Sequence, residues 1–331
     1  MNLQTLAEEF GVSSATVSNA LSGKGRVSAD LARRIRDRAR EMGYAPSSPA
    51  RALRTGRTGV IGLVLADLSN PLFPRFARAV DAAAERAGYG VLIADSHGDV
   101  GAQTAALQRL VRRGADGIVV IPRRGTRVLE LDVPLAVIDA PSTPGNTICA
   151  DHRGGGEALA GRLLSLGHRR LVLIGANRDS NVQRERMGGM RAALLAAGAE
   201  PREVWLEDGT PDFPALARAG VTAFLATSDL HALTVLTALQ RAGLAVPAQA
   251  SVAGFDDLAF AAAVSPALTT MAQDLEAVAE GAVAALSARL AGATPPPEAI
   301  VPMTLIARES TGPAPAVPPP PTTVIRQGVP R

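Results

Sequence analysis

From residue 59 onward, short apolar runs alternate with longer segments that have the apolar spacing of helices. The runs Val60–Leu65 and Leu171–Gly175 are apolar at nearly every position, which is typical of strands buried on both faces. Segments of helical length, such as residues 100–113 and 182–197, separate these runs. The repeated strand–helix alternation predicts doubly wound parallel sheets, so we expect this part of the chain to be an α/β structure.

The alternation starts a second time after residue 150, which predicts two α/β lobes in a core of residues 59–312. We expect an N-lobe of residues 59–150 and 276–297, and a C-lobe of residues 151–273 and 298–312. Two consecutive lobes of this size imply a cleft between them, where a ligand can be held.

Two further segments complete the predicted core, and a C-terminal tail follows it. A helix at residues 275–291 and a strand at residues 300–306 are expected to cross back between the lobes. Residues 313–331 are rich in proline and are predicted to be a disordered tail.

The N-terminal head has a different pattern, which predicts three short helices in residues 1–46. Residues 5–21 form two of them, because Phe10 ends one apolar face and Gly11 can take the positive φ of a tight turn. A third helix is expected at residues 30–42. The outward positions of the second helix are small or hydrogen-bonding, as suits a helix in the major groove of DNA. They are Ser14, Ala15, Thr16, Ser18 and Asn19.

The charges of the chain are concentrated at this head. Residues 1–58 hold ten cations and five anions, whereas the rest holds 24 cations and 26 anions. A basic head on a nearly neutral body is typical of a nucleic-acid-binding protein. The alternative is that the arginines of residues 33–40 only solvate an exposed helix face. The neighbouring helix-turn-helix pattern favours DNA binding.

Cysteine usage and hydropathy indicate the cellular compartment. Cys149 is the sole cysteine, so no intrachain disulfide can form and a reducing cytoplasm is expected. Cys149 itself is predicted to be a small buried hydrophobe. The chain starts with a polar amphipathic helix instead of a signal peptide, and no apolar run approaches the ~20 residues of a membrane span. We expect no membrane partner.

Over residues 2–311 the chain closely resembles the LacI/GalR (lactose-repressor) family of bacterial transcription regulators. Ten short motifs occur in the family's order. They include Val12-Ser13-x-x-Thr16-Val17-Ser18, Gly43-Tyr44-x-Pro46, Asp67-Leu68-Ser69-Asn70-Pro71-x-Phe73 and Gly254-Phe255-Asp256-Asp257. The resemblance implies a homodimer on a near-palindromic, double-stranded operator. It also implies a body like periplasmic sugar-binding proteins, with a small effector between the lobes that alters DNA affinity. The expected effector is a sugar or sugar derivative, with a nucleobase or nucleoside as the alternative.

The resemblance also assigns residues to the DNA end. Those placed at base edges are Ser14, Ala15 and Asn19. Hydroxyl groups at helix starts are expected to meet phosphates, or else only to cap the helices; they belong to Thr5, Ser13, Thr16, Ser18 and Ser28. Residues 47–58 resemble the family's hinge helix, in which an apolar wedge enters the minor groove and arginines contact the backbone. The hinge residues are Leu53 as the wedge, Ala50 beside it, Arg51 and Arg54.

Candidate effector residues lie after predicted strands, where ligands of such folds bind. Asp67 and Ser69 follow the first strand, and Asp139 follows the fourth. By the resemblance, a polar clamp, two further polar residues and an apolar wall form the site. They are Asp139, Arg186 and Asp256 for the clamp, Ser228 and Gln273 beside it, and Phe73 as the wall.

Several of these residues have a structural alternative. Asp256 could instead be a helix cap or half of an ion pair between the lobes. Asp95 and Arg123 also follow strands, and for both a structural role is the favoured interpretation.

Catalysis is not expected. The four histidines are scattered, and His152 and His168 are interpreted as structural. Residues 156–163 imitate a phosphate-binding loop but lack the Lys-Ser/Thr pair and fall inside a predicted helix. No metal-ligand cluster and no cofactor motif is found in the sequence. The rival interpretation from another class is a solute-binding protein, and both the head and the missing signal peptide argue against it.

Overall fold

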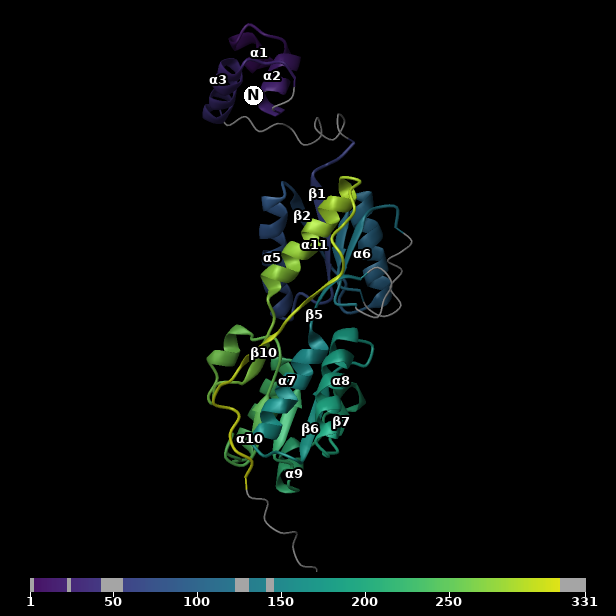
Figure 1. Ribbon diagram of the computed structural model, residues 1–331, viewed down its shortest axis with the longest axis vertical. Helices are drawn as coiled ribbons and strands as arrows, with labels where there is room; N and C mark the ends of the chain where they lie inside the picture. The colour runs from purple at the N-terminus through teal and green to yellow at the C-terminus, as the bar shows by residue number, and fades with distance from the viewer. Residues whose placement is uncertain (1–2, 23–24, 43–55, 123–130, 141–145, 316–331) are drawn as a thin grey trace, which may run out of the picture. The chain divides into compact units, whose positions relative to one another are not determined.

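The computed structural model describes residues 3–22, 25–42, 56–122, 131–140 and 146–315 (Figure 1). The chain divides into two units, residues 1–60 and residues 61–331, and each is described by itself. Some predicted features lie outside the described residues. They are the hinge residues Ala50, Arg51, Leu53 and Arg54, Arg123, and the end of the proline-rich tail.

The first unit contains the three helices that the sequence predicts: α1 (Leu3–Glu9), α2 (Ser14–Ser22) and α3 (Ala29–Glu41). Leu6, Val17 and Ile35, one from each helix, are fully buried against one another. Gly11 has a φ of +60° in the turn between α1 and α2, which an L side chain rarely adopts. The helix-turn-helix prediction is confirmed.

Ion pairs occupy several arginines of the head. The Arg38 Nε contacts Glu9 Oε1 at 2.7 Å and so links α3 to α1. Arg33 and Arg40 each contact an acidic residue one turn away on α3. For these three residues, the alternative interpretation of a solvated helix face is therefore the better one.

The N-lobe is a six-stranded sheet in the order β11-β5-β4-β3-β1-β2, covered by helices on both faces (Figure 1). Helices α5 (Leu72–Arg86) and α11 (Leu275–Leu290) lie side by side on one face, and α6 (Val100–Arg112) covers the other. The strands are β1 (Val60–Leu65), β2 (Gly90–Asp95), β3 (Ile118–Val120), β4 (Leu135–Ile138), β5 (Asn146–Ala150) and β11 (Ala299–Val301).

The C-lobe is a parallel four-stranded sheet in the order β7-β6-β8-β9. Along β6, Leu171 and Leu173 face α7 and α8, whereas Val172 and Ile174 face α9 and α10. This alternation confirms that the apolar runs are strands buried on both faces. The elements are α7 (His152–Ser165), β6 (Leu171–Gly175), α8 (Asn181–Ala196), β7 (Arg202–Trp205), η2 (Leu206–Asp208), α9 (Phe213–Arg218), β8 (Ala223–Ala226), α10 (Asp229–Arg241), β9 (Ser251–Ala253) and η3 (Ala259–Ala262).

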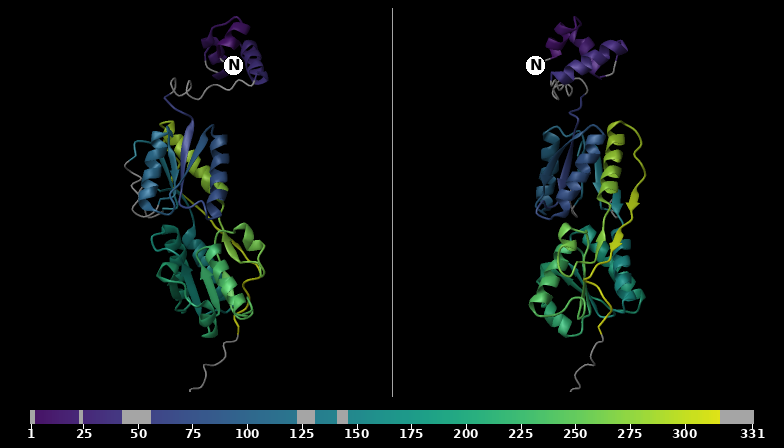
Figure 2. Two further views of the ribbon diagram at one scale, coloured as in Figure 1. Left: turned by 180° about the vertical axis from the view of Figure 1, so that it is seen from behind. Right: turned by 90° about the vertical axis from the view of Figure 1, so that its left-hand side faces the viewer.

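The strand predicted at residues 300–306 is wrong, because it is two strands in two different sheets. β11 pairs with β5 in the N-lobe, whereas β12 (Thr304–Ile306) pairs antiparallel with β10 (Thr270–Ala272). Pro302 lies between them and has no N–H to continue a ladder. Residues 299–301 therefore belong to the N-lobe sheet and not to the C-lobe, and the chain passes between the lobes at this point (Figure 2).

The start of the predicted tail is packed against the C-lobe. The Ala314 N–H donates to the Leu166 carbonyl at 2.8 Å. Just before it, the buried His168 ring approaches the Gly312 carbonyl with Nε2 at 3.0 Å and Thr222 Oγ1 with Nδ1 at 2.9 Å. Burial lowers the pKa of His168, which favours the neutral ring in these contacts. Disorder from residue 313 is thus wrong for residues 313–315.

Two predictions about the cellular compartment remain: that Cys149 is buried, and that the chain has no membrane span. Cys149 is buried on β5, as expected, and burial followed by the charge of Asp139 raises the pKa of its thiol to about 11. Among the described helices, none combines the length and apolar character needed to cross a bilayer.

Helices α7 and α8 approach each other backbone to backbone through two glycines. A methyl group on Gly189 would lie 2.0 Å from the Arg153 carbonyl oxygen, and one on Gly156 would lie 2.3 Å from the Arg186 carbonyl oxygen. Neither position can accept a side chain without separating the helices. This contact brings Arg186 of α8 close to His152 at the start of α7.

We predict that Gly189→Ala lowers the free energy of unfolding by about 2 kcal/mol, because α8 must move away from α7. Gly188→Ala is the matched control, since a methyl group there would come only to 3.6 Å from Arg153 Nη1. The control should be neutral or gain up to about 1 kcal/mol from helix propensity. Urea unfolding of the two variants measures the difference, and equal stabilities would contradict this account of the helix contact.

Candidate functional site

A cavity of about 360 Å³ lies between the two lobes, and residues of both lobes line it. The sequence predicted eight effector residues on segments spread from the end of β1 to Gln273, two residues before α11. The structure brings all eight to this one cavity. They are Asp67, Ser69, Phe73, Asp139, Arg186, Ser228, Asp256 and Gln273.

The centre of the site is a buried ion pair. Arg186 Nη1 lies 2.8 Å from Asp256 Oδ1, and both side chains are at most 3% exposed. The same Nη1 donates to the Thr227 carbonyl at 2.7 Å, and the guanidinium lies over the Phe255 ring at 4.7 Å. A buried charge needs such partners, because its desolvation is otherwise not offset. The structural alternative for Asp256, an ion pair, is therefore real, but this pair also faces the cavity.

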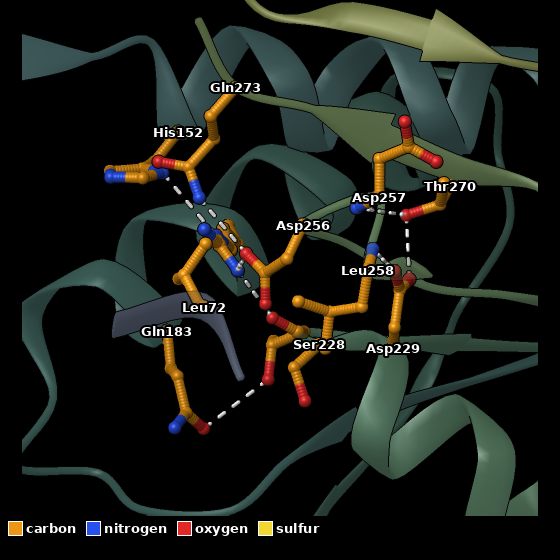
Figure 3. A network of polar contacts seen from close by, with 12 residues as sticks. Leu72, His152, Gln183, Ser228, Asp229, Asp256, Asp257, Leu258, Thr270 and Gln273 are labelled. Atoms are coloured by element: carbon orange, nitrogen blue, oxygen red, sulfur yellow. Dashed lines mark hydrogen bonds and ion pairs between the residues drawn. The ribbon is translucent and has the colours of Figure 1, made fainter. Parts of the chain in front are cut away.

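The backbone at Asp256 has an unusual conformation. Asp256 has a φ of 104°, which an L residue rarely adopts and which costs about 1–3 kcal/mol. Its N–H donates to the Met271 carbonyl at 2.8 Å, and Gln273 Nε2 donates to its Oδ1 at 3.0 Å (Figure 3). Surrounding contacts thus hold the loop after β9 in the form that aims this carboxylate at Arg186.

His152 joins the ion pair to the N-lobe, a role that the sequence did not reveal. Arg186 Nε donates to His152 Nδ1 at 3.3 Å, which assigns the ring proton to Nε2. His152 Nε2 lies 3.2 Å from Asp139 Oδ1, but without the alignment of a good hydrogen bond. The expectation that His152 only opens a helix is therefore incomplete, because the ring bridges two clamp residues.

Asp139 is a buried carboxylate at the end of β4, with a φ of 55°. Burial alone would raise its pKa, but His152, the Ala150 N–H at 3.0 Å and the charge of Arg186 outweigh burial. The pKa of Asp139 therefore lies below its usual range. The group stays ionised at neutral pH and faces the cavity as an acceptor.

Asp229 supports the loop of Asp256 from the side away from Arg186. Its Oδ2 accepts from the Leu258 N–H at 2.8 Å, and its Oδ1 accepts from Thr270 Oγ1 at 2.6 Å (Figure 3). Burial raises the pKa of Asp229 to about 7, against the effect of these hydrogen bonds. The carboxyl thus braces the loop without lining the cavity.

Other predicted cleft residues have local structural contacts as well. Asp67 Oδ1 accepts from the Ser69 N–H at 2.8 Å and from Ser69 Oγ at 2.6 Å, which fixes the turn after β1. Ser228 caps α10, and its Oγ lies 2.9 Å from His231 Nδ1. Phe73 is half-buried and packs partly into the N-lobe core. Each therefore presents only part of its side chain to a ligand.

Asp95 has the structural role that was favoured for it. Its carboxylate accepts from the Leu68 N–H at 3.1 Å and the His97 N–H at 2.8 Å. Burial opposes ionisation, but these backbone donors hold the pKa of Asp95 below its usual value. It is absent from the described lining of the cavity.

Several lining residues were missed by sequence reasoning. Gln183 precedes Arg186 by one turn of α8 and therefore shares its face, a signal that the sequence did contain. His231 follows Ser228 by one turn of α10 in the same way. The missed polar residues are Asn70, Asn177, Ser180, Asn181, Gln183, Thr227 and His231. Within the described residues, no group of His, Cys, Asp and Glu side chains is arranged to hold a metal ion.

In the head, Ser14 and Ala15 are exposed at the start of α2, where base contacts were expected. Asn19 is half-buried, and a methyl group on Gly25 would lie 2.9 Å from its Nδ2, so its amide lies against the turn before α3. This position favours a local contact for Asn19 over base reading.

The hydroxyl groups of the head divide into caps and surface groups. Ser13 Oγ accepts from the Thr16 N–H at 3.1 Å, and Ser28 Oγ accepts from the Leu31 N–H at 3.4 Å, so the capping alternative is observed for both. Both are also exposed, as is Thr5, whereas Thr16 and Ser18 are half-buried.

Comparison with known protein families agrees with both parts of this architecture. Residues 2–47 match the family described as bacterial regulatory proteins, lacI family. Residues 160–311 match the periplasmic binding protein-like domain.

Individual relatives cover nearly the whole chain. The HTH-type transcriptional regulator reg1 of Streptomyces lividans is 32% identical over 95% of this chain and 97% of its own length. A crystal structure of the lac repressor dimer bound to operator and the anti-inducer ONPF has a TM-score of 0.81 and 25% identity, covering 94% of this chain and 99% of that one. The CelR–cellobiose complex has a TM-score of 0.68 and 27% identity, with the same coverage. The chain belongs to the LacI family of bacterial transcriptional regulators.

Proposed function

We propose that this regulator is a cytoplasmic repressor that binds a near-palindromic operator as a homodimer and is switched by a small sugar in the cleft. The observation that carries the proposal is that one chain combines a helix-turn-helix head with a cavity lined by all eight predicted effector residues. The lac repressor structure, a dimer on operator DNA, supports the DNA half. Residues 47–58, with Leu53 as the wedge, stay our proposed hinge.

The shape and charge of the cavity support a small uncharged sugar. Its volume of about 360 Å³ is near the lower end of ligand pockets, which run from about 300 to 1,000 Å³. Among the described lining residues, Asp67, Asp139 and Asp256 carry carboxylates and Arg186 carries a guanidinium. Carboxylates and guanidinium groups bind neighbouring hydroxyls well, but an excess of carboxylates repels a phosphorylated ligand. The CelR relative holds cellobiose.

The alternatives make different demands on the same chain. A nucleobase or nucleoside needs side chains with flat apolar faces on which its own rings can stack. Among the described lining residues, the side chains that carry aromatic rings are Phe73 and His231. A solute-binding protein without a DNA role has no use for the helix-turn-helix head. Because the relatives are transcriptional regulators, we infer that the cleft binds its ligand without transforming it.

For the head, we predict that Ser14→Glu weakens binding to DNA about 30-fold, because it places a carboxylate opposite phosphates at the exposed start of α2. The DNA is the duplex that the wild-type protein selects from a random-sequence pool, and fluorescence anisotropy gives the affinity. Arg40→Gln is the matched control, since it also lowers the charge of the head by one unit but lies near the end of α3. Equal losses in both variants would contradict a reading role for α2.

For the cleft, we predict that Arg186→Gln with Asp256→Asn raises the Kd for an effector about 100-fold, because two of the charged partners of its hydroxyls are lost. Replacing both together leaves no buried charge without a partner. The probes are D-glucose, D-galactose, maltose and cellobiose, with glucose 6-phosphate and adenosine as competing classes, measured by calorimetry.

The control for this variant is Arg178→Gln with Asp208→Asn, which removes an exposed ion pair of the C-lobe. It should bind the sugar as the wild type does, and both double variants should keep their affinity for DNA. Unchanged sugar binding in the Arg186/Asp256 variant would remove this pair from the effector site. Binding of adenosine alone would overturn the sugar assignment.

A further inference from the structure

Arg75, which is absent from the described lining of the cavity, makes a polar contact between the lobes. Arg75 lies on α5 of the N-lobe, two residues after Phe73. Its Nη1 donates to the Asp257 carbonyl at 2.7 Å and to the Asp256 carbonyl at 3.2 Å, both in the C-lobe loop after β9. These are charge-assisted hydrogen bonds, which are stronger than neutral ones.

The carbonyls that Arg75 holds belong to the two residues with unusual backbone conformations. Asp256 and Asp257 have φ values of 104° and 47°. Their side chains leave the loop in other directions, Asp256 to Arg186 and Asp257 to Arg308, whose Nη2 lies 2.6 Å from Asp257 Oδ1. Arg75 therefore holds the main chain of this loop, while its carboxylates are engaged by other arginines.

The position of Arg75 makes its contact depend on the distance between the lobes. Helix α5 packs on the N-lobe sheet, so Arg75 moves with the N-lobe. The Asp256 N–H donates to the carbonyl of Met271 in β10, so the loop moves with the C-lobe. The chain segments that cross between the lobes can bend while staying intact, but two hydrogen bonds of 2.7 and 3.2 Å cannot survive separation of the lobes.

We propose that Arg75 is an interlobe latch that sets the lobe spacing of the ligand-free protein and positions Asp256 for the effector. The latch itself is independent of the ligand, and its effect on affinity rests on the function proposed above. The apparent affinity of a ligand scales with the fraction of protein in the binding-competent form. Because Arg75 is exposed, its hydrogen bonds stabilise the binding-competent form only modestly. Loss of the side chain reduces the fraction of protein in that form about fivefold.

The direct test is the distance between the lobes in the ligand-free, full-length protein. Spin labels are placed at two exposed positions, Arg112 on α6 and Arg241 on α10, after Cys149→Ala. Dilution with unlabelled chain leaves one labelled protomer in each dimer, and pulsed electron resonance measures the distance distribution. Arg75→Ala shifts the population toward longer distances, and Arg75→Lys, which keeps a donor of the same charge, restores it in part.

The matched control is Arg78→Ala, which removes an exposed arginine one turn further along α5. It keeps the wild-type distance distribution. A wild-type distribution in Arg75→Ala overturns the latch, and so does an equal shift in Arg75→Ala and Arg78→Ala, which would be an effect of net charge.

A second measurement connects the latch to the effector. With whichever of the four neutral sugars binds the wild type, Arg75→Ala raises the Kd about fivefold, whereas Arg78→Ala leaves it unchanged. An unchanged Kd in Arg75→Ala, together with a lengthened interlobe distance, overturns the positioning of Asp256. If no sugar binds any variant, the proposed function fails while the distance measurement still decides the latch.

Discussion

The buried ion pair between Arg186 and Asp256 is the interaction on which the geometry of the cleft depends. At 2.8 Å and almost without exposure, it has a large desolvation cost that only a full set of partners offsets. Those partners are the Thr227 carbonyl, the Phe255 ring, His152 and Gln273. Because they come from four different segments, the ion pair fixes those segments relative to one another.

Each partner connects the pair to a larger part of the body. The glycine contact of α7 and α8 places Arg186 beside His152, and His152 reaches Asp139 at the end of an N-lobe strand. Gln273 lies where the chain leaves the C-lobe for α11. A ligand that binds the carboxylates or the guanidinium therefore acts on both lobes at once. This arrangement gives an effector the means to change the spacing of the lobes.

Much of the fold could be predicted because its signals are local. The bounds of β1 and β6 follow from apolar runs, and the eight cleft residues gather because carboxyl ends of parallel strands meet at one edge. Other features depend on distant partners. The role of His152 comes from a residue 34 positions away, and that of Arg75 from carbonyls more than 180 positions away. The separation of β11 from β12 at Pro302 did have a local signal, because proline interrupts a strand ladder. The apolar residues on both sides of Pro302 nevertheless favoured the prediction of one continuous strand.

The central claim is that occupancy of the cleft and binding of DNA are coupled in this chain. Coupling between two sites is reciprocal, so each ligand must change the affinity of the other by the same factor. The decisive measurement is the Kd of the sugar with and without saturating operator DNA, beside the Kd of operator with and without saturating sugar. The account predicts that both values change by one common factor, in the range of about 5 to 150. A sugar Kd that is identical in the presence and absence of operator would contradict it.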